Sequence, residues 1–225
     1  MQPNLAQVLN TLAHEIRTPL AVSQGYLKLL IDGRITNADD SRRAMEQTRQ
    51  ALGALAALCM DMGKVSALAD DGAQRRAADG QASGVPVTTP AADFIANLQA
   101  RDEVKGAAWH GQTGSLMIAS AHQRDLAEAV AITMKAAFDE DRDAPHTVKI
   151  DAGSALTLLA GSDRALPALQ SDPAAPGARG VDFSKGGKGL KLIWAAFVLE
   201  RHGVETWADA QQRATVGFRI PLVKA

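Results

Sequence analysis

The sequence predicts an α+β fold in which an N-terminal antiparallel helical hairpin precedes an α/β sandwich. Apolar residues recur at helical spacing from about Asn4 to Ile31, and again as far as about Leu68. Beyond about residue 84 the pattern changes to short apolar strands interspersed with helical segments. Together these observations favour a helical unit followed by one sheet with helices on one face.

The hairpin is predicted by two amphipathic runs with a short polar break between them. Asp32-Gly33-Arg34 ends the first run, and Asp39 and Asp40 stand where the first turn of a second helix would begin. Two such helices cannot bury both apolar stripes alone, so we expect a homodimer in which two hairpins form a four-helix bundle. The first stripe comprises Leu5, Val8, Leu9, Leu12, Ile16, Leu20, Leu27, Leu30 and Ile31.

Composition divides the chain into a hairpin at 1–70, a linker at 71–84 and a second domain at 85–225. The linker contains almost no large apolar residues. In the second domain the pattern predicts strands at 85–87, 115–118, 147–150, 155–159 and 214–222, and helices at 90–99, 122–138 and 190–202.

Charge and composition exclude several classes of partner. The formal net charge of -1 provides no general attraction to nucleic acid or anionic lipid, and aromatic residues at 4% are too scarce for base-stacking platforms. No apolar run reaches the roughly 20 residues of a membrane helix. The single Cys59 excludes an internal disulfide and a cysteine-based metal cluster. We therefore expect a cytoplasmic protein that has no nucleic-acid or membrane partner and no metal site of its own.

The string His14-Glu15-Ile16-Arg17-Thr18-Pro19-Leu20 carries the clearest chemical signal. A neutral imidazole is nucleophilic near pH 7, and Glu15 could orient the ring or take the proton that is released on attack. Thr18 follows one helical turn later, where its hydroxyl could position a water molecule. A zinc-protease motif would need a second histidine at position 18 and is excluded.

This string, together with the hairpin around it, resembles the phosphoacceptor box of two-component sensor histidine kinases. The resemblance implies that His14 accepts a phosphoryl group and passes it on, with Glu15 and Thr18 as catalytic partners. It also implies that a response-regulator receiver domain is the partner, and that this domain supplies its own Mg²⁺ for the transfer.

Residues 85–225 resemble the ATP-binding domain of the same kinases. The segment Gly187-Lys188-Gly189-Leu190-Lys191-Leu192 is similar to the family's second glycine box, with Lys191 in place of its last glycine. Glycines before a helix allow backbone N–H groups to approach phosphate closely. The resemblance therefore makes Gly187, Gly189 and Leu190 candidate nucleotide-binding residues.

Other nucleotide motifs of that domain are degenerate here. Ile132 and Ala136 occupy the positions of the family's asparagines, and neither side chain can ligate Mg²⁺. Gly161 aligns with the adenine-binding aspartate, although a shift of one or two residues would place Asp163 there. The resemblance thus predicts a retained scaffold and disfavours ATP as the phosphoryl donor.

These features lead to one prediction of function and two alternatives. The prediction is a histidine phosphotransferase in which His14 exchanges a phosphoryl group with a response-regulator aspartate. One alternative is an ATP-dependent sensor histidine kinase with a divergent nucleotide site. The other is a non-catalytic dimeric adaptor that binds a response regulator.

Overall fold

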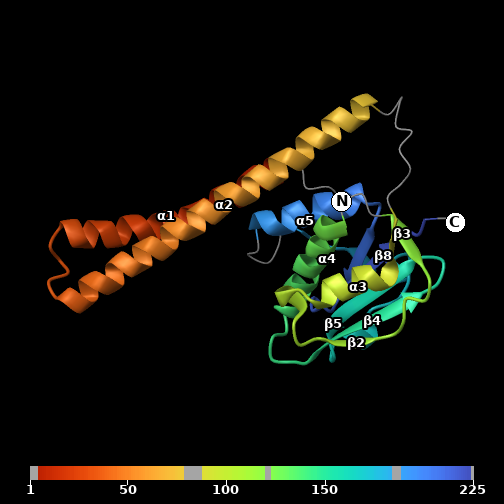
Figure 1. The fold of residues 1–225 in the computed structure, drawn as a ribbon. Helices are drawn as coiled ribbons and strands as arrows, with labels where there is room; N and C mark the ends of the chain where they lie inside the picture. The colour runs from red at the N-terminus through yellow and green to blue at the C-terminus, as the bar shows by residue number, and fades with distance from the viewer. Residues whose placement is uncertain (1–4, 79–87, 120–122, 184–188, 224–225) are drawn as a thin grey trace.

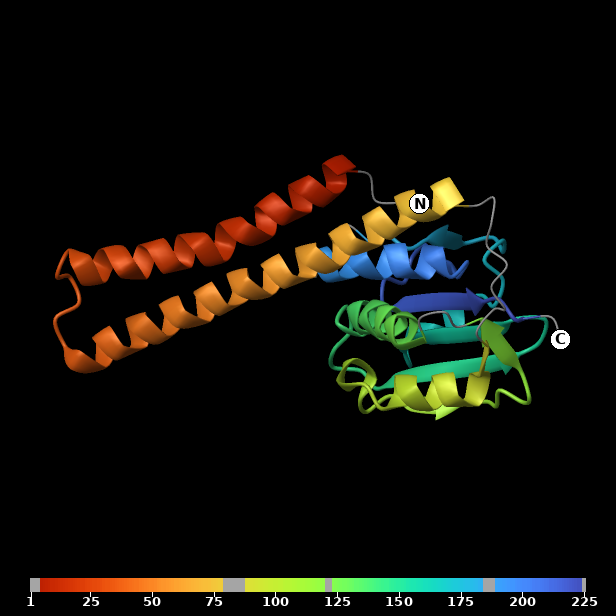
Figure 2. The same cartoon turned by 45° about the horizontal axis from the view of Figure 1, so that its top comes forward.

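A computed structural model describes residues 5–78, 88–119, 123–183 and 189–223. Helices α1 (Leu5–Ile31) and α2 (Ala38–Ala78) form an antiparallel hairpin that projects from the rest of the molecule (Figure 1). The remaining elements form an α/β domain beside the second half of α2 (Figure 2). The predicted α+β class is therefore the observed one.

The turn between α1 and α2 has well-defined ends. Gly33 adopts a positive φ of 65°, and the Arg34 N–H donates to the Leu29 carbonyl at 3.0 Å, which closes α1 in the usual way of a left-handed C-terminal residue. At the start of α2, the Asn37 side-chain oxygen accepts a hydrogen bond from the Asp40 N–H at 2.7 Å. The acidic first turn of α2 also matches the positive end of the helix dipole.

Helix α2 extends further than predicted. The sequence pattern ended the second helix near Leu68 and placed a linker at 71–84, whereas the backbone remains helical through Ala78. Alanine, glutamine and arginine at 73–78 are good helix formers, so this segment keeps the helical backbone without an apolar stripe.

Within the described residues, six strands form a mixed sheet in the order β2-β4-β5-β8-β7-β6, and β1 pairs with β3 in a separate small sheet. Strand β2 runs parallel to β4, and the other neighbouring pairs are antiparallel. The strands are β1 (Thr88–Pro90), β2 (Ala108–His110), β3 (Met117–Ala119), β4 (His146–Ala152), β5 (Leu156–Ser162), β6 (Ala178–Gly180), β7 (Glu205–Asp209) and β8 (Thr215–Ile220).

Helices α3 (Ala91–Gln99), α4 (Gln123–Phe138) and α5 (Gly189–Arg201) cover one face of the large sheet (Figure 1). Their apolar side chains join those of β4, β5 and β8 in the main core, which includes Phe94, Leu126, Met134, Leu158 and Phe218. The three predicted helices and the predicted strands at 147–150, 155–159 and 214–222 agree with these elements, and the one predicted at 115–118 overlaps β3. The strand predicted at 85–87 lies outside the described residues.

The opposite face of the sheet carries a second, smaller core. Leu166 and Leu169, from the segment after β5, pack with Leu159 and Trp207. The Trp207 indole N–H donates to the Gln170 carbonyl at 2.8 Å, and its ring lies directly over Gly217 of β8. A Cβ at position 217 would lie 2.3 Å from Trp207 Cε2, so this packing requires glycine.

We predict that Gly217→Ala lowers the free energy of unfolding by about 2 kcal/mol, because the added methyl group must displace the buried indole ring. Urea denaturation at fixed protein concentration measures the change. Gly180→Ala is the matched control, since a Cβ there meets no atom within 4 Å. Equal effects of the two substitutions would contradict the packing role of Gly217.

Candidate functional site

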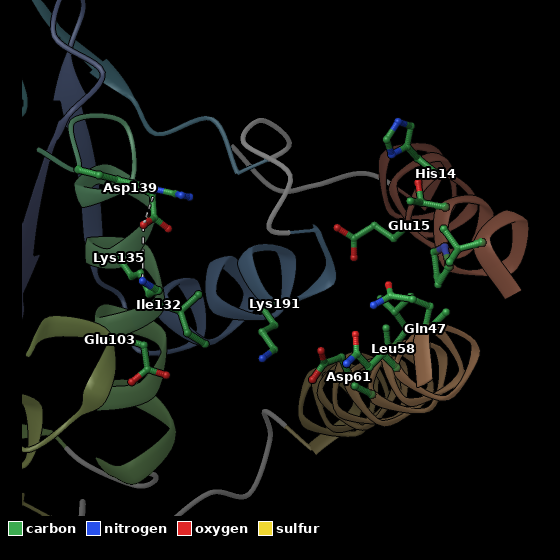
Figure 3. A pocket seen from close by; sticks show the side chains of 18 residues that line it. His14, Glu15, Gln47, Leu58, Asp61, Glu103, Ile132, Lys135, Asp139 and Lys191 are labelled. Carbon is green, nitrogen blue, oxygen red and sulfur yellow. Dashed lines mark ion pairs between the residues drawn. The ribbon is translucent and has the colours of Figure 1, made fainter. Parts of the chain in front are cut away.

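His14 lies on α1 with its ring exposed to solvent. Figure 3 shows the imidazole projecting from the helix beside the cavity, while the next side chain, Glu15, points toward α5. A side chain at this position can meet another protein without any rearrangement of the hairpin. The geometry therefore meets the first requirement of a group that exchanges phosphate with a separate domain.

The Glu15 carboxylate contacts the first turn of α5. It accepts a hydrogen bond from the Leu190 N–H, and it lies so close to Gly189 that a Cβ there would be 1.7 Å from Glu15 Oε1. Burial raises the pKa of the Glu15 carboxyl above its ordinary value. The hydrogen bond from Leu190 opposes this shift, and the nearby Asp61 carboxylate adds to it.

A cavity of about 1060 Å³ separates the hairpin from α4 and α5. The three predicted catalytic residues, His14, Glu15 and Thr18, all line it, and Figure 3 shows the first two beside this cavity. The hairpin wall mixes apolar with polar side chains, and, besides His14 and Glu15, both units contribute charged residues to the lining. These charged residues are Asp61, Glu103, Lys135, Asp139, Arg142 and Lys191.

The sequence contained no motif that singled out Asp61 or Glu103. Asp61 comes from α2 and Glu103 from the short 3-10 helix Asp102–Val104, far from His14 along the chain. Lys191 departs from the glycine-box pattern, and that pattern does not indicate that its side chain lines this cavity. Each of these residues enters the site through the packing of the hairpin on the α/β domain.

The candidate nucleotide residues lie at the start of α5. Gly189 has a positive φ of 50° and forms the contact with Glu15 together with Leu190, whereas Gly187 lies outside the described residues. The sequence predicts that backbone N–H groups at the start of α5 approach a phosphate. In the structure, the Leu190 N–H donates to the Glu15 carboxylate of the same chain.

The two positions expected to hold asparagines face different cavities. Ile132 lines the cavity beside the hairpin, and Ala136 lines a second cavity of about 350 Å³ between α4, α5 and the sheet. Hydrocarbon side chains provide no oxygen ligand in either place. The described residues contain no cluster of three or more histidine, cysteine, aspartate or glutamate side chains that could hold a metal ion.

Gly161 serves the packing of the sheet. A Cβ at this position would lie 2.6 Å from the Ala214 carbonyl oxygen, so no side chain fits between β5 and β8. Asp163 is exposed in the following turn, where its N–H donates to the Pro145 carbonyl at 2.9 Å. Neither residue lines the two cavities described above.

Comparison with known proteins agrees with the site. Residues 4–64 match the family described as the His Kinase A (phospho-acceptor) domain, and the match contains the whole His14 string. Residues 4–64 are thereby identified as similar to a histidine-kinase phospho-acceptor domain.

Three solved structures are similar to the chain at low sequence identity. A bacterial phosphotransferase is 13% identical with a TM-score of 0.36, and 97% of this chain and 99% of that one are covered. Full-length ShkA in complex with AMPPNP is 15% identical with a TM-score of 0.48, and the chain spans about half of ShkA, 47%. The catalytic domain of histidine kinase ThkA is 13% identical with a TM-score of 0.36, over 61% of this chain and 96% of that one.

No curated protein matches the sequence. Among the helices that the structure describes, none combines the length and the apolar character of a membrane span.

Proposed function

We propose that this protein is a histidine phosphotransferase in which His14 exchanges a phosphoryl group with the aspartate of a response-regulator receiver domain. The observation that carries the proposal is the exposed imidazole of a phospho-acceptor hairpin, next to an α/β domain in which Ile132 and Ala136 of α4 stand where asparagine ligands for Mg²⁺ are expected. A cytoplasmic location, expected from the composition, is part of the same proposal.

The transfer needs only the groups that the two partners bring together. A ring nitrogen of neutral His14 attacks the phosphorus of the receiver's aspartyl phosphate, a P–N bond forms, and the P–O bond to the aspartate breaks. The aspartate leaves as a carboxylate, and the attacking imidazole becomes a phosphorylated imidazolium that can lose its proton to water. The reverse steps pass the phosphoryl group to a second receiver.

The metal in this reaction is expected to belong to the partner. Mg²⁺ prefers hard oxygen ligands, and Ile132 and Ala136 offer none. Phosphoryl transfer from MgATP depends mainly on positioning and charge neutralisation around the triphosphate. The residues present therefore do not fit MgATP with the family's usual ligands, and no step is assigned to it.

The hairpin supplies a surface for the proposed homodimer. Large apolar side chains along α1 and α2 remain exposed in the single chain, and a stripe of this kind is covered when two hairpins form a four-helix bundle. These residues include Leu9, Leu20, Leu27, Ile31, Met45 and Leu52, of which Ile31 is 82% exposed. Glu15 and Asp61 face the cavity and the α/β domain instead, so dimerisation leaves that contact free.

We predict that His14 becomes labelled by a receiver domain that has been phosphorylated with acetyl phosphate in Mg²⁺, and that ATP with Mg²⁺ gives no label. His14→Ala should abolish the acid-labile label, whereas His110→Ala, at an exposed histidine of β2, should retain it. Label from ATP would favour the kinase alternative, and no label from either donor would favour the adaptor. Persistence of label in His14→Ala would show that another residue is the acceptor.

Thr18 is expected to act in dephosphorylation of the partner regulator, because its exposed hydroxyl lines the cavity one helical turn beyond His14. Thr18→Ala should slow release of inorganic phosphate from the phosphorylated receiver by about tenfold or more and leave His14 labelling intact. Thr18→Ser keeps the hydroxyl and should behave like the parent chain. If Thr18→Ala reduces both reactions equally, the residue only supports the helix.

We predict that Leu27→Asp weakens dimerisation by at least about 100-fold, because each dimer would bury two charged groups in an apolar interface. Sedimentation equilibrium measures the dissociation constant. Lys28→Asp provides a neighbouring control on a different side of α1, where the side chain is exposed and polar. A parent chain that sediments as a monomer at micromolar concentration would contradict the dimer.

A further inference from the structure

The first turn of α5 binds an anion that belongs to the chain itself. The first N–H groups of a helix have no partner within the helix, and they carry its partial positive charge. Here the Leu190 N–H donates to the Glu15 carboxylate, which lies against the Cα of Gly189. Only glycine allows both this contact and the φ of 50° at position 189.

A second contact joins α2 to the same domain. Lys64 Nζ lies 3.3 Å from Glu128 Oε1 of α4 and 5.4 Å from the centre of the Trp194 ring of α5, and the neighbouring Val65 packs against the main core. The ion pair is half exposed on the lysine side and adds little stability by itself. The Lys64–Glu128 pair nevertheless provides a chemical marker of contact between the hairpin and the α/β domain.

The direction of the Glu15 side chain separates it from the chemistry at His14. Figure 3 shows the carboxylate directed toward α5, while the imidazole projects from α1 in a different direction. A proton acceptor for the ring would have to come within hydrogen-bond reach of a ring nitrogen. In the arrangement described, the carboxylate accepts a hydrogen bond from the Leu190 N–H, whereas His14 contributes the smallest of the effects that shift the pKa of Glu15.

We propose that Glu15, expected from the sequence to orient the His14 ring or take its proton, is instead a positioning residue that anchors the α/β domain to the hairpin through the first turn of α5. The anchored domain then forms a fixed wall beside His14, against which an incoming receiver docks. This role rests on the proposed phosphotransfer at His14. The anchor affects how firmly the receiver is held and not the bond-making step. Loss of the anchor therefore raises the receiver concentration needed for half-maximal transfer and leaves the rate at saturation unchanged.

The anchor is tested in the full-length chain with a carbodiimide, which joins an amine and a carboxylate only when they are in contact. The yield of the Lys64–Glu128 cross-link, measured by mass spectrometry after a short reaction, should fall about tenfold in Glu15→Ala, which removes a charge-assisted hydrogen bond. Glu15→Gln keeps an oxygen that can accept from Leu190, so its yield should stay within about twofold of the parent. Asp61→Asn, at another carboxylate that lines the same cavity, is the matched control and should not change the yield.

Transfer from the phosphorylated receiver is then measured for the same variants. Glu15→Gln should label His14 as the parent does, whereas Glu15→Ala should need about tenfold more receiver for half-maximal rate. The proposal is overturned if the cross-link yield is the same in all variants. It is also overturned if Glu15→Gln and Glu15→Ala lose labelling at saturation alike, because a proton acceptor would then be the better account. Since the cross-link forms without any phosphoryl group, it reports on the anchor even where the proposed function fails.

Discussion

Helical periodicity is the constraint on which the arrangement of this molecule depends. Consecutive residues on an α-helix project about 100° apart, so neighbours in the sequence serve different surfaces. His14 is exposed to solvent, Glu15 contacts α5, and Leu20 and Leu27 lie on the exposed apolar stripe. One helix can thereby expose the imidazole, contact a second domain and present an apolar stripe on different sides of its surface.

The α/β domain combines a well-packed scaffold with altered chemistry. Its core buries large apolar side chains on both faces of β5, and Gly161 and Gly217 allow close approach of neighbouring groups in the sheet. The positions where the family would supply oxygen ligands carry hydrocarbon at Ile132 and Ala136. Sheet packing does not require metal ligands, so a fold of this kind can persist after those ligands are replaced.

The strength of the local pattern separates the elements that were predicted from those that were missed. Helices α4 and α5 and strands β4, β5 and β8 have sustained apolar patterns, and the sequence located them within a few residues. Strands β2 and β6 have three residues each and lie at the sheet edges, while β7 begins and ends with acidic residues. Their strand conformation depends on hydrogen bonds to neighbours that are distant in the sequence, and a local pattern carries no record of those partners.

The sequence by itself determined the hairpin, the phospho-acceptor string, and the hydrocarbon side chains at positions 132 and 136, because each is a property of residue type and short-range spacing. Only the tertiary structure decided that Glu15 contacts Gly189 and Leu190, and that Asp61 and Lys191 share a cavity with His14. These contacts join residues from the two ends of the chain. They exist because α1 and α2 pack beside α5, and that packing results from the surfaces of both units together.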